Sequence, residues 1–305
     1  MYKFPLNKLP RALEATGQQV FTEIKNIKDF FFPKTECIAT FVNTKNEIAI
    51  NDAHAPVEPF ILYGVKPCDA EALTILDKVF LSAPVDTFYE NRRKNATVIT
   101  AMCTKPDETC FCTAFNIDPQ AQEYGDVATF VIEDTIYWKP LTEKGEKLTE
   151  KISVGNKMIP TEKCFVGDAS PTFSNLTLGN FTPQNLMQLF NHPAWENLHK
   201  TCLACGTCTF TCPTCHCYDI QDHNTGEKII RHRCWDSCMY SDFTQMAHSN
   251  PRTSQLERFR QRFMHKLMYF PENNDGQFAC VGCGKCVQNC PVGLHIVKVA
   301  KALEV

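Results

Sequence analysis

The sequence predicts an α+β protein with a mixed α/β N-terminal domain, residues 1–175, followed by a mainly α-helical domain, residues 183–305. Length is one reason, because 305 residues exceed the usual size of a single domain. Patterning is another, since β-type runs alternate with helical periodicity in the first half and are scarce in the second. Cysteine distribution is the third: twelve of the eighteen cysteines fall between Cys202 and Cys290.

The first half alternates strand and helix signals. After the apolar run at 60–65, Asp69 is the expected N-cap of a helix, and apolar residues then repeat at helical spacing up to Phe80. Cys68 is therefore expected on a strand-to-helix turn, where a helix N-terminus favours the thiolate. The β-type runs are Cys37–Val42, Phe60–Tyr63, Thr97–Thr100 and Val127–Ile132.

The second half begins after a stretch rich in turn formers, residues 168–183, which we interpret as a linker. Apolar residues beyond it recur with helical periodicity, and this predicts helices rather than strands. The expected helices cover Pro183–Lys200, Leu256–Leu267 and His295–Leu303.

Two cysteine runs of identical spacing carry the strongest chemical signal. They are Cys202-x2-Cys205-x2-Cys208-x3-Cys212-Pro213 and Cys280-x2-Cys283-x2-Cys286-x3-Cys290-Pro291. Both match the bacterial ferredoxin pattern, in which the fourth cysteine of each run ligates the other [4Fe-4S] cluster. The helical patterns around the runs favour a helical ferredoxin domain. The expected ligands are Cys202, Cys205, Cys208 and Cys290 for cluster 1, and Cys280, Cys283, Cys286 and Cys212 for cluster 2.

Zinc is the alternative for these cysteines, because it also takes four thiolates, usually as two pairs with x2 spacing. A duplicated run of four cysteines that ends in proline favours the iron–sulfur cluster. Reduction potentials of such clusters span roughly 1 V, so the sequence leaves the direction of electron flow open.

Four cysteines of the first half are candidates for a third [4Fe-4S] cluster. Cys103, Cys110 and Cys112 follow a predicted strand, and Cys68 on its turn supplies a fourth thiol. The alternative is that some of them are small buried hydrophobic residues. A Cys-x-Cys pair in a loop after Pro106 is an unusual core pattern, which favours the cluster.

A further set of cysteines lies between the two runs: Cys215, Cys217, Cys234 and Cys238. It is a candidate for a fourth cluster or zinc, or it packs beside the first run. Cys215 and Cys217 follow Cys212 so closely that geometry argues against a separate site. Cys37 and Cys164 stand alone and are expected in the core.

Basic residues concentrate on the expected helix Leu256–Leu267. We expect them on its solvent side, as an ordinary solvated face or as a docking surface for an acidic partner or electron donor. These residues are Arg258, Arg260, Arg262, His265 and Lys266.

Composition and missing motifs exclude several function classes. The 31 basic and 34 acidic residues give a net charge of −3, which argues against nucleic-acid binding. The absence of a signal peptide and of a long apolar stretch predicts a cytoplasmic protein without a membrane partner. Many cysteines in such a protein indicate metal ligation and favour anaerobic metabolism. No nucleotide-binding motif is present, so an electron carrier of this kind is expected to need partners at both ends.

The cysteine motifs and their neighbours together resemble one family. It comprises the beta subunit of cytosolic sulfhydrogenases and the iron–sulfur subunit of anaerobic sulfite reductase. The resemblance covers nearly the whole chain after residue 60. It rests on the segments 64–73, Cys103 to Cys112, 202–217 and Arg233–Cys238, and continues through Asn250–Arg252, Glu257, Arg258, His265, Lys266 and Cys280–Cys286.

This resemblance implies a dicluster subunit working beside a flavoprotein that uses NAD(P)H. A terminal redox unit of the hydrogenase, sulfite reductase or bifurcating transhydrogenase type completes the expected complex, with ferredoxin as a further candidate partner. The family's motif cysteines map onto Cys68, Cys103, Cys110, Cys112, Cys215, Cys217 and Cys238, and Cys234 is an extra cysteine in this chain.

Two other functions compete with this electron-transfer subunit, which is not expected to be an enzyme on its own. In the first, the N-terminal domain is itself a catalytic module that binds flavin or substrate, with the cysteines of the first half at the reacting centre. In the second, zinc staples a scaffold that only assembles partners.

Overall fold

The computed structural model describes residues 1–43, 47–154, 156–162, 171 and 176–304. The chain packs as two compact units. The first unit comprises Met1–Ile27, Val57–Ser174 and Val281–Cys283, and the second comprises Lys28–Pro56, Asn175–Cys280 and Gly284–Val305. The division into domains 1–175 and 183–305 that the sequence suggests remains a prediction, and it differs from the boundaries of these two units.

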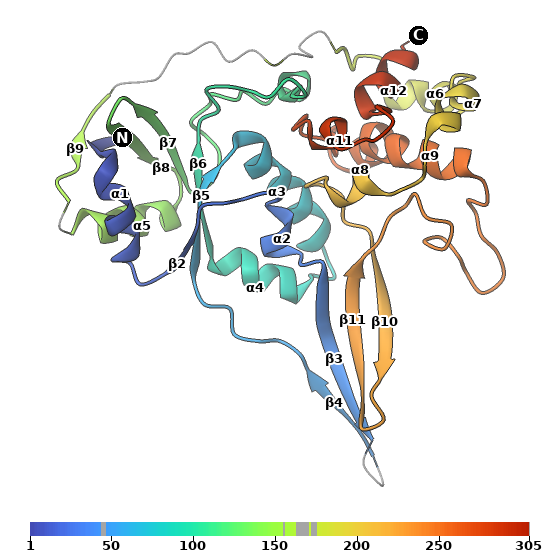
Figure 1. The fold of residues 1–305 in the computed structure, drawn as a ribbon, viewed down its shortest axis with the longest axis horizontal. Coiled ribbons are helices and arrows are strands. Elements are labelled where there is room, and N and C mark those ends of the chain that lie inside the picture. Colours follow the sequence, from blue (N-terminus) through green and yellow to red (C-terminus); the bar gives the residue numbers. More distant parts are fainter. Residues whose placement is uncertain (44–46, 155, 163–170, 172–175, 305) are drawn as a thin grey trace. The chain divides into compact units, whose positions relative to one another are not determined.

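A seven-stranded mixed sheet organises the first unit, with strand order β2-β5-β6-β7-β8-β1-β9 (Figure 1). Strands β2, β5, β6 and β7 are parallel, and β7, β8, β1 and β9 are antiparallel. The mixed α/β character predicted for the N-terminal part is therefore confirmed. The strands are β1 (Tyr2–Pro5), β2 (Gln19–Phe21), β5 (Phe60–Val65), β6 (Ala96–Ala101), β7 (Val127–Ile132), β8 (Thr135–Pro140) and β9 (Ile159–Pro160).

The helices of the first unit begin and end at recognisable signals. Asp86 caps α4 by accepting a hydrogen bond from Tyr89 N, and Thr142 caps α5 by accepting one from Gly145 N. The N-cap expected at Asp69 is wrong: α3 begins at Pro67 after Lys66, because proline suits the first helical position. The helices are α1 (Leu9–Glu14), α3 (Pro67–Phe80), α4 (Thr87–Asn95) and α5 (Glu143–Ser153), with short 3-10 turns η1 (Leu6–Lys8) and η2 (Cys112–Phe115).

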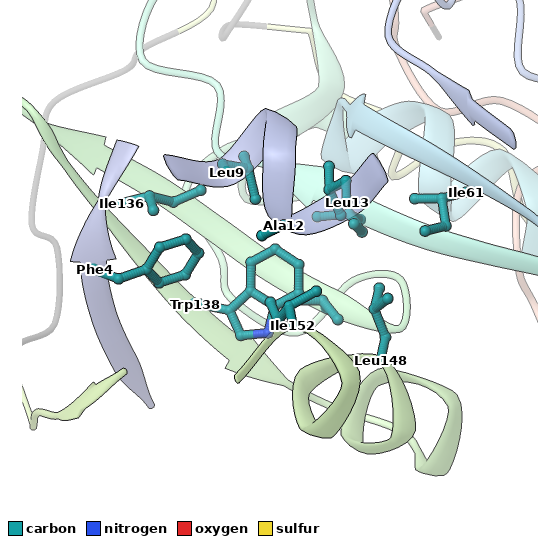
Figure 2. Packing of buried hydrophobic residues seen from close by; sticks show 11 residues of the cluster. Phe4, Leu9, Ala12, Leu13, Ile61, Ile136, Trp138, Leu148 and Ile152 are labelled. Atoms are coloured by element: carbon teal, nitrogen blue, oxygen red, sulfur yellow. The ribbon is translucent and has the colours of Figure 1, made fainter. Parts of the chain in front are cut away.

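The core beneath α1 and α5 centres on Trp138, whose side chain is fully buried. Figure 2 shows Leu9 and Leu13 from α1 and Leu148 from α5 around the Trp138 ring. The indole Nε1–H donates to Thr149 Oγ1 at 2.8 Å, so the one polar atom of this large side chain is satisfied. This packing fixes one face of the sheet that carries Cys68 and Cys103 at its edge.

A four-stranded antiparallel sheet, β10-β11-β3-β4, belongs to the second unit (Figure 1). A strand was predicted at 37–42 and is found as β3, but the hairpin β10–β11 was missed. All seven residues of β10 are exposed, and only Tyr218 and Ile220 among them are apolar, which is too short an alternation to indicate a strand. A mainly helical C-terminal domain is therefore not shown. The strands are β3 (Thr35–Asn43), β4 (Ile48–Asp52), β10 (Tyr218–Asn224) and β11 (Lys228–Trp235).

Short helices complete the second unit. A capping box at Ser254 starts the longest one, in which Glu257 and Ser254 satisfy each other's backbone N–H groups. This helix, α9 (Gln255–Met264), continues into a π-helical turn, η5 (His265–Tyr269), and then α10 (Phe270–Asn273). The others are α2 (Lys28–Phe31), η3 (Pro183–Asn185), α6 (Leu186–Phe190), α7 (Trp195–Leu198), η4 (His199–Thr201), α8 (Thr207–Phe210), α11 (Lys285–Gln288) and α12 (Ile296–Ala302). Among the residues described, no helix has the length and apolar character needed to cross a membrane.

Replacing Thr149 with valine tests the buried hydrogen bond of Trp138. Thr149→Val keeps the shape but leaves the indole N–H without its acceptor, so we expect a loss of about 1–3 kcal/mol in the free energy of unfolding. Urea unfolding measures it. In a Trp138→Phe background the same change should cost less, because no buried donor remains. An equal cost in both backgrounds would contradict this role.

Candidate metal centres

The four cysteines expected to hold cluster 1 line one pocket of the second unit. Cys202 follows η4, Cys205 and Cys208 flank the start of α8, and Cys290 follows α11. All four line the same pocket, which encloses about 410 Å³ of empty space, including some open to solvent. Phe259, Phe263 and Arg262 line its inner side.

Backbone geometry at this pocket suits thiolate ligands. Ala204 N donates to Cys202 Sγ at 3.4 Å, and Leu294 N donates to Cys290 Sγ at 3.2 Å. Gly206, with φ of 72°, starts α8 and leaves room for the Tyr240 hydroxyl, which an added Cβ would meet at 2.7 Å. Hydrogen bonds to sulfur are among the features that set the reduction potentials of iron–sulfur clusters.

The pKa values of the pocket thiols reflect their surroundings. Burial raises the pKa of Cys202, whereas the hydrogen bond with the Thr207 side chain lowers that of the more exposed Cys205. Metal binding needs the thiolate, so the chain must offset the burial of Cys202 by positive charge or amide donors.

The second run begins beside a network that also holds the end of the first. Cys212 Sγ lies 3.2 Å from Thr214 Oγ1, and Thr214 Oγ1 donates to Ala279 O at 2.8 Å. Lys266 Nζ donates to both Thr214 Oγ1 and Ala279 O, at 2.7 and 2.8 Å. The residues next to Cys212 and Cys280 are thus held together by one ammonium group.

Two basic residues expected on the solvent side of the helix are buried instead. Arg262 is 2% exposed and Lys266 is 3% exposed. Helical periodicity explains the error, because Arg262 lies three residues after Phe259 and Lys266 lies three residues after Phe263, so each shares the buried face of that phenylalanine. Burial lowers the pKa of Lys266, but the thiolates of Cys212, Cys215 and Cys280 outweigh it, so its pKa is raised.

Lys28 is a third buried cation beside the cysteines, and the sequence analysis missed it. Its Nζ donates to Cys215 O at 2.9 Å and stands 3.6 Å from the centroid of the Trp235 ring. Burial lowers the pKa of Lys28, with Cys215 and Cys212 opposing that effect. No pattern signals it, because α2 has only four residues.

In the first unit, topology brings the candidate ligands of a third cluster to one edge. Strands β5 and β6 are parallel neighbours, so Cys68 after β5 and Cys103 after β6 follow the same edge of the sheet. Burial lowers the pKa of Lys66, yet Asp107 and the thiolates of Cys103, Cys68 and Cys110 raise it overall. Burial raises the pKa of Cys112 to about 11, and the charges of Cys110 and Cys103 add to this effect.

The Cys110–Cys112 loop also packs against Val281–Cys283, the part of the second cysteine run that belongs to the first unit. Phe111 N donates to Gly282 O at 2.8 Å, and Cys110 Sγ lies 4.0 Å from Cys283 O. Gly282 has φ of 58°, and an added Cβ would stand 2.6 Å from Cys112 Cα. Only glycine fits this approach.

The further set of cysteines is only partly brought together. Cys217 and Cys238 share a side-chain hydrogen bond that lowers the pKa of Cys217 to about 7 and raises that of Cys238, which Cys215 also raises. A similar bond between the side chains of Cys212 and Cys215 lowers the pKa of Cys212 and raises that of Cys215. Cys234 is not brought to these thiols. Burial raises its pKa, and the neighbouring charges that add to this effect are the carboxylates of Asp219 and Asp236.

Two cysteines expected in the core remain. Cys37 is half-buried on β3, with Sγ 3.7 Å from Ala39 O, and Cys164 lies outside the described residues. In the described part of the chain, no group of three or more His, Cys, Asp or Glu side chains has the arrangement that would hold a single metal ion.

Comparison with known proteins identifies the family. Residues 201–294 match the family described as a 4Fe-4S dicluster domain. The sulfhydrogenase 2 beta subunit of Pyrococcus furiosus is 33% identical over 279 residues, which cover 89% of this chain and 80% of the relative. The chain belongs to the iron–sulfur beta-subunit family of sulfhydrogenases. The recognition made from the sequence is thereby confirmed, and a dicluster domain indicates at least two [4Fe-4S] clusters.

The residues of this chain fit such clusters chemically. The pocket offers four thiols and no carboxylate, amide donors point at two of the sulfurs, and the buried cation Arg262 lines it as well. Cysteine thiolates hold iron–sulfur clusters, and hydrogen bonds to the sulfurs and the exposure of the site to solvent set the reduction potentials.

Iron analysis of a double variant tests the candidate third cluster. Cys110→Ser with Cys112→Ser should lower iron and acid-labile sulfide from about twelve to about eight per chain, because one four-iron cluster is lost. Cys37→Ser, on the isolated cysteine of β3, is the control and should keep about twelve. About eight irons in the unaltered chain and in the double variant would make the two cysteines structural.

Substitution of Cys234 and Cys238 separates the members of the further set. We expect Cys234→Ser to leave total iron and zinc unchanged, because its thiol lies beside Asp219 and Asp236. Cys238→Ser should disturb the buried thiols and lower the midpoint of thermal unfolding. Elemental analysis and calorimetry measure the two effects. Metal loss in Cys234→Ser would show that the separation of Cys234 is wrong.

Proposed function

We propose that the chain is a non-catalytic electron-transfer subunit of a cytoplasmic multisubunit oxidoreductase complex. It would relay electrons between a flavoprotein subunit that uses NAD(P)H and a terminal redox unit of the hydrogenase, sulfite reductase or bifurcating transhydrogenase type. The family supports an iron–sulfur electron-transfer subunit. The pocket lined by Cys202, Cys205, Cys208 and Cys290 is the single observation that supports it most.

The proposed ligand sets follow the two runs. Cys202, Cys205, Cys208 and Cys290 would hold cluster 1, and Cys280, Cys283, Cys286 and Cys212 would hold cluster 2. Cys68, Cys103, Cys110 and Cys112 would hold a third. Bound clusters supply one-electron transfer without bond chemistry. The contact between Phe111 and Gly282 supports electron transfer between the third cluster and the second, because it joins the loops that carry their proposed ligands.

A reduction assay with purified components tests this proposal. The anaerobically purified chain should contain no flavin and should not be reduced by NADH or NADPH, because its residues supply no hydride acceptor. Dithionite, or NAD(P)H with a catalytic amount of a flavoprotein of the ferredoxin-reductase type, should bleach its visible absorption. Bleaching by NAD(P)H alone, or flavin bound to the isolated chain, would instead make the N-terminal domain a catalytic module.

A further inference from the structure

Arg262 is a buried cation whose hydrogen-bonding capacity is mostly unused. Its Nη2 donates to Cys208 O at 3.0 Å. Its Nε and Nη1 are buried and have no hydrogen-bond partner among the described residues. Buried polar groups are nearly always paired in native proteins, and burying an unpaired charge is especially unfavourable. The unused donors therefore indicate that an anion belongs beside this guanidinium.

The surroundings of Arg262 identify that anion. Its side chain lines the pocket formed by Cys202, Cys205, Cys208 and Cys290. Burial lowers the pKa of Arg262, but the thiolates of Cys208, Cys286, Cys215 and Cys212 raise it overall. Cys208 belongs to the proposed ligands of cluster 1, and Cys286 and Cys212 to those of cluster 2. One guanidinium therefore faces both proposed ligand sets.

Lys266 extends the same positive charge along the helix. It lies one turn after Arg262 in the π-helical turn η5, and π-bulges inside helices are often found at functional sites. Its ammonium group is held by Thr214 and Ala279, beside Cys212 and Cys280. The two cations thus have fixed positions relative to the cysteines, because hydrogen bonds to the backbone hold them in place.

We propose that Arg262, assisted by Lys266, is a positioning residue that sets the reduction potentials of the two clusters, an inference that rests on the proposed electron-transfer function. A cluster held by four thiolates gains one negative charge when it is reduced. A buried positive charge stabilises the reduced form more than the oxidised form, and the effect is strong where water is excluded. Arg262 therefore raises both potentials, which makes each cluster easier to reduce.

The test is a redox titration followed by electron paramagnetic resonance, on the full chain with its clusters. Arg262→Gln removes the charge, and we expect the ratio of reduced to oxidised cluster at a fixed solution potential to fall about tenfold, a shift of about 59 mV. Arg262→Lys keeps the charge and should restore most of the shift. Arg260→Gln is the matched control on the same helix, because the Arg260 guanidinium stacks on Phe190 at 3.6 Å and donates a hydrogen bond to Phe190 O.

The outcomes separate this inference from the proposed function. Unaltered chain without iron, or without a reducible signal, would refute the electron-transfer function itself. Unchanged potentials in an Arg262→Gln variant that keeps its iron would overturn the role of Arg262 alone. If that variant loses iron, Lys266→Met is titrated instead, and unchanged potentials there overturn the proposal. Equal shifts in Arg260→Gln and Arg262→Gln would also overturn it, because the effect would then reflect net charge.

Discussion

Thiolates crowded into a buried space repel one another, and this repulsion constrains the second unit. Six of its cysteines lie near the buried cations Lys28, Arg262 and Lys266, which are each no more than 3% exposed. These cysteines are Cys208, Cys212, Cys215, Cys217, Cys280 and Cys286. Burying these cations among apolar side chains would be unfavourable without nearby negative charge. The thiolates and the cations therefore lower the free-energy cost of burying one another, and the packing around Phe259 and Phe263 depends on this compensation of charge.

The first unit solves a different problem, which is to gather cysteines that are distant in sequence. Parallel strands place their carboxyl ends at one edge of a sheet, so Cys68 and Cys103 follow the same edge although they are 35 positions apart in the sequence. The core around Trp138 includes Ile61 of β5 and Ile99 of β6, so it packs on the same two strands that lead to these cysteines. Within the same unit, Gly282 then allows the backbone of Val281–Cys283 to approach the backbone of the Cys110–Cys112 loop closely.

The sequence predicted those features that depend on a local pattern of residues. It did not predict features that depend on contacts between residues distant in the sequence. The cysteine spacing predicted the dicluster domain, and apolar runs predicted β5, β6 and β7. The exposed strand β10 carries only a short apolar alternation, because its stability comes from pairing with β11. Arg262 was expected on the solvent side because it is charged, although its spacing of three residues from Phe259 places it on the buried face of the helix. No local pattern could have shown that Cys234 lies apart from Cys238, since both flank the same short segment.

The segment between the two runs is more than a spacer. It contributes α9 and the π-helical turn η5, which carry Arg262 and Lys266, and its two ends supply Thr214 and Ala279. Thr214 comes two residues after Cys212, and Ala279 directly precedes Cys280, so Lys266 joins the end of one run to the start of the other. The Lys266 ammonium group thereby holds residues next to both runs in place and also supplies positive charge beside Cys212 and Cys280. The fold of this segment and the electrostatics of the cysteines consequently depend on each other. The buried cations need negative charge nearby, and the buried thiolates need the positive charge that the segment supplies.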